Sequence, residues 1–120
     1  MTFLGSIRSD IKAKAQWLYG EATCGSMLKA CCTDGTAAMI LYRLMQSSQR
    51  LRLAPLAMVF NKLNTILGQC VIGRHADFGA RLVFVHSQGI VINSAVKGGD
   101  DLCIEHQVTI GAEKDTAPVL

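Results

Sequence analysis

The sequence predicts an α+β fold, in which an α-helical N-terminal region, residues 1–69, precedes a parallel β-helix over residues 70–120. Two observations lead to this prediction. Before about Gly68, apolar residues recur at intervals of three and four, which is typical of amphipathic helices. After it, large apolar residues recur every six residues, as they do when each flat side of a triangular β-helical coil has one inward side chain.

The first two helices are short. Helical spacing in IRSDIKAKAQWLYG predicts a helix over about 8–19, with Ser9 and Asp10 as possible caps. Gly20 is expected to end it, because glycine readily adopts the left-handed backbone conformation that follows many helices. A further short helix is expected over 26–32.

Two more helices complete the N-terminal region. After a turn at Asp34–Gly35, the pattern over 36–50 predicts a helix with one apolar face. Its opposite face carries Arg43 and Gln46, which we expect to face solvent. The last helix covers 55–67 and begins on a proline, whose fixed backbone angle suits the first position of a helix.

The six-residue repeat occupies the rest of the chain, and turn-forming residues fill its gaps. The repeated positions are Ile72, Phe78, Phe84, Ile90, Val96, Leu102 and Val108. Stacked coils would bury these side chains in columns. The alternative is a set of ordinary short strands, such as RLVFV, GIVIN and HQVTI, in an antiparallel sheet.

The number of coils is small. From Ile72 to Leu120 there are 49 residues, fewer than three coils of about 18 residues each, whereas repeat folds generally need about three repeats and a cap. We therefore expect an incomplete β-helix, which belongs either to a truncated product or to a fragment of a longer enzyme.

Charge and cysteine content exclude several classes. The 12 Lys and Arg residues against 9 Asp and Glu are scattered, so we expect a solvated face rather than a nucleic-acid or membrane surface. The five cysteines lack paired spacing, which argues against a disulfide framework or a metal site. Without an export signal or an apolar run that could cross a bilayer, the chain is expected to be cytoplasmic.

A family resemblance rests on residues 71–112. The segments VIGRHADFGARLVFVHSQGIVIN and DDLCIEHQVTIGA resemble the hexapeptide-repeat, left-handed β-helix acyltransferases, and most closely the serine acetyltransferases. That family's pattern reads approximately I-H-P-x-A-x-I-G-x-G-x-x-x-D-H-x-x-G-I-V-I-G, then G-D-N-V-x-I-x-x-x-V-T-L-G-G. Matching positions are Ile72, Phe78, Gly79, His86, Gly89, Ile90, Val91, Ile92, Asp101, Ile104, Val108, Thr109 and Gly111.

The resemblance implies an O-acetyltransferase of cysteine biosynthesis, which transfers acetyl from acetyl-CoA to a hydroxyl of serine or a serine-like small molecule. His86 matches the catalytic histidine, and a histidine suits the general base that a hydroxyl nucleophile requires. An isolated histidine would more often be a polar corner residue; the G-I-V-I context favours catalysis. His75 is expected to be solvated. The resemblance also implies a homotrimer or a dimer of trimers, with active sites between subunits.

Further site residues follow from the same resemblance. Gly89 and His106 are expected to contact the acceptor; His106 comes 20 residues after His86, close to one coil, although a plain surface position is an equal alternative. Cofactor-binding residues are taken as Gly111, Ala112 and Lys114, with backbone amides on pantetheine and the lysine on phosphate.

Two departures from the family pattern concern the acceptor. Val85 stands where serine acetyltransferases usually carry the Asp that orients the catalytic histidine, and Ala117 stands in place of a second substrate-contacting histidine. The alternatives are therefore a sugar or polysaccharide O-acetyltransferase of the same fold, or a non-catalytic, truncated assembly module.

Overall fold

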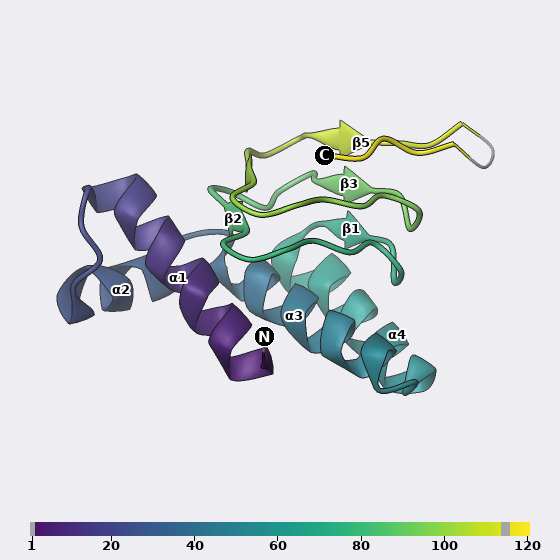
Figure 1. Cartoon of the computed structure of the whole chain (residues 1–120), viewed down its shortest axis with the longest axis horizontal. Helices are drawn as coiled ribbons and strands as arrows, with labels where there is room; N and C mark the ends of the chain where they lie inside the picture. The colour runs from purple at the N-terminus through teal and green to yellow at the C-terminus, as the bar shows by residue number, and fades with distance from the viewer. Residues whose placement is uncertain (1, 114–115) are drawn as a thin grey trace.

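The computed structural model describes residues 2–113 and 116–120. The helices are α1 (Phe3–Tyr19), α2 (Cys24–Cys31), α3 (Thr36–Arg50) and α4 (Ala54–Leu63), followed by the π-helical turn η1 (Asn64–Gly68). The strands are β1 (Val71–Ile72), β2 (Val83–Phe84), β3 (Val91–Ile92), β4 (Cys103–Ile104) and β5 (Thr109–Ile110). Figure 1 shows the helices gathered on one side of the stacked strands.

Helix α1 begins five residues before the predicted start at residue 8, because Thr2 caps it by accepting a 3.0 Å hydrogen bond from the amide of Gly5. The expectation that Ser9 or Asp10 caps this helix is therefore wrong. The end is as predicted: Gly20 has φ 73°, a left-handed conformation that glycine adopts without steric cost.

Helices α2 and α3 surround the Asp34–Gly35 turn. A capping box between Thr23 and Ser26 starts α2 two residues earlier than expected, whereas α3 spans residues 36–50 as predicted. The expectation of a solvent-facing Arg43 and Gln46 is wrong, since their exposed fractions are 2% and 5%. Both side chains are buried because the first turn of the strand region packs over that face of α3 and supplies polar partners.

The last predicted helix, 55–67, is divided in the structure. Regular α-helix ends at Leu63, and the wider π-helical turn carries the chain to Gly68. The amide of Cys70 donates to the carbonyl of Asn64 at 3.3 Å, which ties the end of this turn to the entry of β1. The proline expected at the first position, Pro55, is the second residue of α4.

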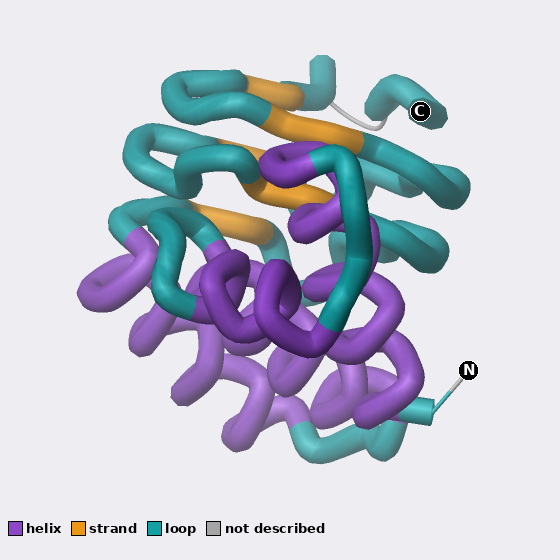
Figure 2. Tube along the Cα trace, turned by 90° about the vertical axis from the view of Figure 1, so that its left-hand side faces the viewer, coloured by secondary structure: helices purple, strands orange, loops and turns teal. Residues whose placement is uncertain are grey.

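The strands pair in parallel across successive turns of the chain. Val71 of β1 pairs with Val91 of β3, which pairs with Thr109 of β5, while Val83 of β2 pairs with Cys103 of β4. Figure 2 shows these short strands stacked above the helices. The antiparallel alternative is therefore wrong, and the α+β class with parallel strands is confirmed; the described strands form two separate sheets, not one closed sheet.

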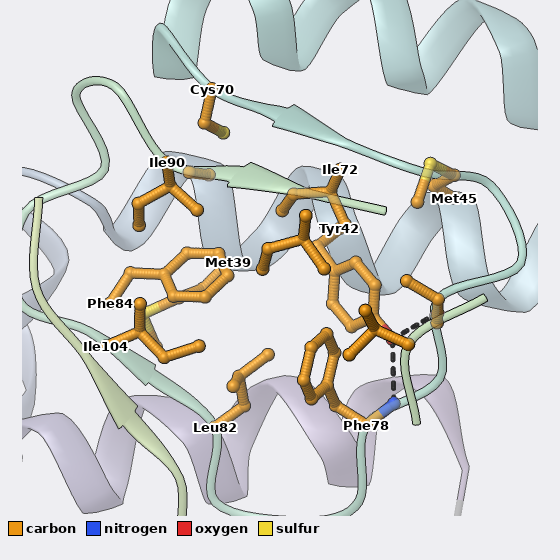
Figure 3. Close-up of a cluster of buried hydrophobic side chains, with 14 of the residues drawn as sticks. Met39, Tyr42, Met45, Cys70, Ile72, Phe78, Leu82, Phe84, Ile90 and Ile104 are labelled. Carbon is orange, nitrogen blue, oxygen red and sulfur yellow. Dashed lines mark hydrogen bonds between the residues drawn. The ribbon is translucent and has the colours of Figure 1, made fainter. Parts of the chain in front are cut away.

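The core lies between α3 and the strand region. Of the seven repeated positions, those at 72, 78, 84, 90 and 96 are each no more than 2% exposed, whereas Leu102 and Val108 are only partly buried against the core. Figure 3 shows several of these side chains against Met39, Tyr42 and Met45 of α3. The Tyr42 hydroxyl donates to the carbonyl of Ala76 at 2.9 Å and accepts from the amide of Phe78 at 3.0 Å. Helix α3 thus fixes the first turn of the strand region in place.

Cys70 is expected to be the slowest of the five thiols to react with iodoacetamide. It is 2% exposed and burial raises its pKa to about 11, whereas Cys24, Cys31, Cys32 and Cys103 are exposed. The thiolate is the reactive form, so both effects slow alkylation. Peptide mass spectrometry after timed labelling measures this, and labelling in urea, where all five should react alike, is the control. Equal labelling of Cys70 in the native chain would contradict its burial.

Candidate active site

His86 lies two residues after β2 and faces a carboxylate that the sequence did not predict as a partner. Its Nδ1 lies 3.4 Å from Oδ2 of Asp34, and the two side chains are 46% and 62% exposed. Asp34 belongs to the turn between α2 and α3, 52 residues earlier in the chain. The sequence predicted a turn at Asp34–Gly35. It did not predict that this turn lies beside His86, because the two are far apart in the chain.

Glycine at position 35 lets this turn approach β2. Gly35 has φ 85°, and a Cβ there would lie 2.5 Å from the carbonyl oxygen of Phe84. Any larger residue would therefore push the turn away from the strand that leads into His86. Beyond His86, Ser87 is buried and donates to the carbonyl of Gly68 at 2.6 Å. His86, whose imidazole is exposed, thus lies between Phe84, which contacts the Gly35 turn, and Ser87, which is bonded to Gly68.

His106 lies beside His86, one turn of the chain later. The ring centroids are 5.7 Å apart with an interplanar angle of 72°, and His106 Nδ1 lies 3.6 Å from Oε2 of Glu105. The amide of Gln107 donates to the carbonyl of Gln88 at 2.9 Å, which stacks the two corners. His106 is 53% exposed and adjoins the candidate base, and its contact with an acceptor stays a prediction.

The arrangement has the elements of proton transfer. A carboxylate beside Nδ1 stabilises an imidazolium and favours the tautomer that leaves Nε2 free to accept a proton from a bound hydroxyl. The neighbouring residue Val85 is 9% exposed and offers no hydrogen-bonding side chain. Asp34, from another element, is therefore the carboxylate that lies beside Nδ1 of the imidazole. Within the described residues there is no cluster of three or more His, Cys, Asp or Glu side chains suited to a metal ion.

The other predicted site residues lie in different places. Gly89 follows His86 closely in a corner with φ 76°, and its amide donates to the carbonyl of Gln69 at 2.9 Å. Gly111 is exposed and Ala112 half-buried directly after β5. Lys114 lies outside the described residues. No helix among residues 2–113 and 116–120 is long and apolar enough to cross a membrane.

Lys14 of α1 lies next to this site in a fully buried position, with an exposed fraction of 0%. Its ammonium donates to the carbonyl of Asp34 and, at 3.0 Å, to the hydroxyl of Thr36. Burial lowers the pKa of Lys14 from 10.5 to about 8, and the ionised forms of Asp34, Cys103 and Cys31 oppose that shift. The expectation that the cations form a solvated face is wrong for Lys14 as it is for Arg43.

The free energy of unfolding should depend on pH through Lys14. The folded chain binds this proton less tightly than the unfolded chain, so the contribution of Lys14 to stability rises from about pH 8 to 10.5. Urea unfolding at pH 7 and pH 10 should show the wild type gaining stability relative to Lys14→Met, by at most about 3 kcal/mol. Contributions of Cys70 and Tyr42, whose raised pKa values act in the opposite direction, are common to both chains and cancel. An unchanged difference between the two pH values would contradict this coupling.

The fold of this chain is similar to that of solved structures. No family model and no curated protein matches the chain. Among solved structures, a serine acetyltransferase in complex with CoA is similar with TM-score 0.85 and 20% identity, over 98% of this chain and 49% of that one. A serine acetyltransferase from Neisseria gonorrhoeae in complex with serine gives TM-score 0.80 and 21% identity, over 98% and 48%. A serine acetyltransferase from Vibrio cholerae gives a TM-score of 0.80 and 23% identity, over 92% of this chain and 42% of that one.

The chain spans about half the length of the solved structures that it matches. At 20–23% identity the likeness shows a shared fold, and it agrees with the resemblance found in residues 71–112. Over the part that it covers, this chain has the fold of the serine acetyltransferases.

Proposed function

We propose that this chain carries part or all of an acetyl-CoA-dependent O-acetyltransferase, in which His86 is the general base. The observation that carries the proposal is His86 Nδ1 lying 3.4 Å from the Asp34 carboxylate, within a fold shared with serine acetyltransferases. A solved neighbour in complex with CoA and another in complex with serine support the two substrate classes.

The reaction follows from the orientation of the imidazole. With Nδ1 3.4 Å from the Asp34 carboxylate, Nε2 accepts the proton of the acceptor hydroxyl while the hydroxyl oxygen attacks the thioester carbonyl. The carboxylate stabilises the imidazolium that results. When the carbon–sulfur bond breaks, the imidazolium returns the proton to the sulfur, so the products are the O-acetyl ester and free CoA. His106 would contact the acceptor from the adjacent corner, and Gly89 would let the acceptor approach the backbone.

The fold suggests how the site is assembled. We propose that residues 70–120 form the first coils of a left-handed β-helix on a helical region, residues 1–69, since strands pair in parallel at steps of 18 and 20 residues. Active sites between subunits of a trimer would place Gly111, Ala112 and Lys114 along the acetyl-CoA groove. Sedimentation of the full chain measures the number of subunits.

Serine is the first acceptor to test, and a sugar hydroxyl is the second. Val85 favours the second, because its apolar side chain cannot accept a hydrogen bond from an amino group or an imidazole as an aspartate would. Asp34 favours the first, because an exposed carboxylate beside the base can pair with an ammonium.

The test is CoA release from acetyl-CoA by the full chain, with serine and with a panel of sugars. CoA should be separated by chromatography, because four exposed cysteines would react with a thiol reagent. Acceptor-dependent release supports the proposal, and the acceptor that saturates identifies the substrate class. Binding of neither acetyl-CoA nor any acceptor by a folded, oligomeric chain would favour the assembly module instead.

A further inference from the structure

Lys14 joins three helices at the turn that carries Asp34. Its ammonium, on α1, reaches the carbonyl of Asp34 and the hydroxyl of Thr36 at the start of α3. The Thr36 hydroxyl in turn donates to the carbonyl of Ala30 in α2 at 2.6 Å. One buried cation thus donates to the carbonyl of Asp34 and to the hydroxyl of Thr36, on either side of Gly35.

The same turn is confined from the other side by β2. Gly35 leaves no room for a Cβ against the carbonyl of Phe84, two residues before His86. The turn is therefore held between α1 and the strand that presents the imidazole, and Figure 1 shows α1 running beside β2. Any shift of the turn would change the 3.4 Å separation between Asp34 and His86.

Packing alone does not account for a lysine at this position. The buried residues Ile11, Ala15 and Ala30 form a small apolar cluster between α1 and α2, the helix that carries Lys14 and the helix before the turn. Burying an ammonium costs free energy unless it is well paired, so the polar contacts to the turn are the specific result of having Lys14 there.

We propose that Lys14 is a positioning residue, which holds the turn at residues 33–36 so that the Asp34 carboxylate faces His86. The proposal rests on the proposed function for its catalytic meaning, but the position of the turn can be measured without activity. No contact between Lys14 and a substrate is required.

The test compares Lys14→Met with Lys12→Met, which changes an exposed lysine on the same helix. Hydrogen–deuterium exchange of the full chain should show amides 33–36 exchanging at least about tenfold faster in Lys14→Met, while amides of β1 and β3 are unchanged. Lys12→Met should exchange like the wild type. Equal protection of the turn in Lys14→Met would overturn the proposal.

Activity gives the second readout. Lys14→Met should lower kcat about 10- to 100-fold with an unchanged KM for acetyl-CoA, and Asp34→Asn should do the same. The double variant should lose no more than either single one, because Lys14 acts through Asp34. Losses that multiply would overturn the proposal.

Two further measurements separate the positioning role from misfolding of the variant and from failure of the proposed function. If Lys14→Met does not fold, Thr36→Val removes the second partner of the ammonium while keeping the shape of the side chain, and should loosen the same turn. If the wild type releases no CoA, the proposed function fails, while faster exchange confined to residues 33–36 still supports the positioning role.

Discussion

Replacing His86 by alanine is expected to lower kcat for CoA release by about 10²- to 10⁴-fold, the range that general-base catalysis typically contributes. The imidazole is 46% exposed and makes no core contacts, so the variant should fold with wild-type stability. Because the side chain removes a proton rather than holding acetyl-CoA, the KM for acetyl-CoA should stay near that of the wild type. Steady-state kinetics with a saturating acceptor measures both quantities.

His75→Ala is the matched control. His75 is also exposed and lies in a corner of the same strand region, where its Nδ1 is 3.4 Å from Nε2 of Gln49, away from the Asp34 turn. It should keep wild-type kcat. Full activity in His86→Ala would remove this residue from the reaction, and an equal loss in both variants would show that the effect is general rather than catalytic.

Replacing Arg43 by methionine is expected to destabilise the fold by about 3–5 kcal/mol, which is the usual cost of removing one partner of a buried ion pair. The side chains of Arg43 and Asp10 are 3% and 1% exposed, and the guanidinium contacts both carboxylate oxygens, at 2.6 and 2.9 Å. It also donates to the carbonyl of Gly79 at 2.6 Å, so the variant leaves the Asp10 carboxylate without its counter-charge and the Gly79 carbonyl without this donor. Urea unfolding followed by far-UV circular dichroism measures the loss.

Arg8→Met, at an exposed position on α1, is the control and should change stability by less than about 0.5 kcal/mol. The double variant Asp10→Asn with Arg43→Met should recover part of the loss, because the uncompensated charge is gone while an amide oxygen remains for the backbone N–H of Leu82. A loss below about 1 kcal/mol in Arg43→Met would show that water reaches the pair.

Local patterns in the sequence predicted much of the architecture. The helix over 36–50 was correct, and so was burial at 72, 78, 84, 90 and 96 of the six-residue repeat, because both depend on which side chains share a face within one element. Boundaries were less certain. Thr2 begins α1 earlier than its apolar pattern suggests, and the π-helical turn ends the fourth helix differently, since hydrogen bonds at helix ends decide where regular structure begins and stops.

The sequence by itself predicted the class of fold and most of the inward column, and its resemblance to a family singled out His86 as the candidate base. Only the tertiary structure decided that Asp34 faces His86 and that Lys14 and Arg43 are buried cations. The physical reason is that a periodic pattern reports neighbours within a helix or along successive coils. Asp10 and Arg43 are 33 residues apart, and such pairs form only when packing removes both groups from water and leaves each as the other's partner.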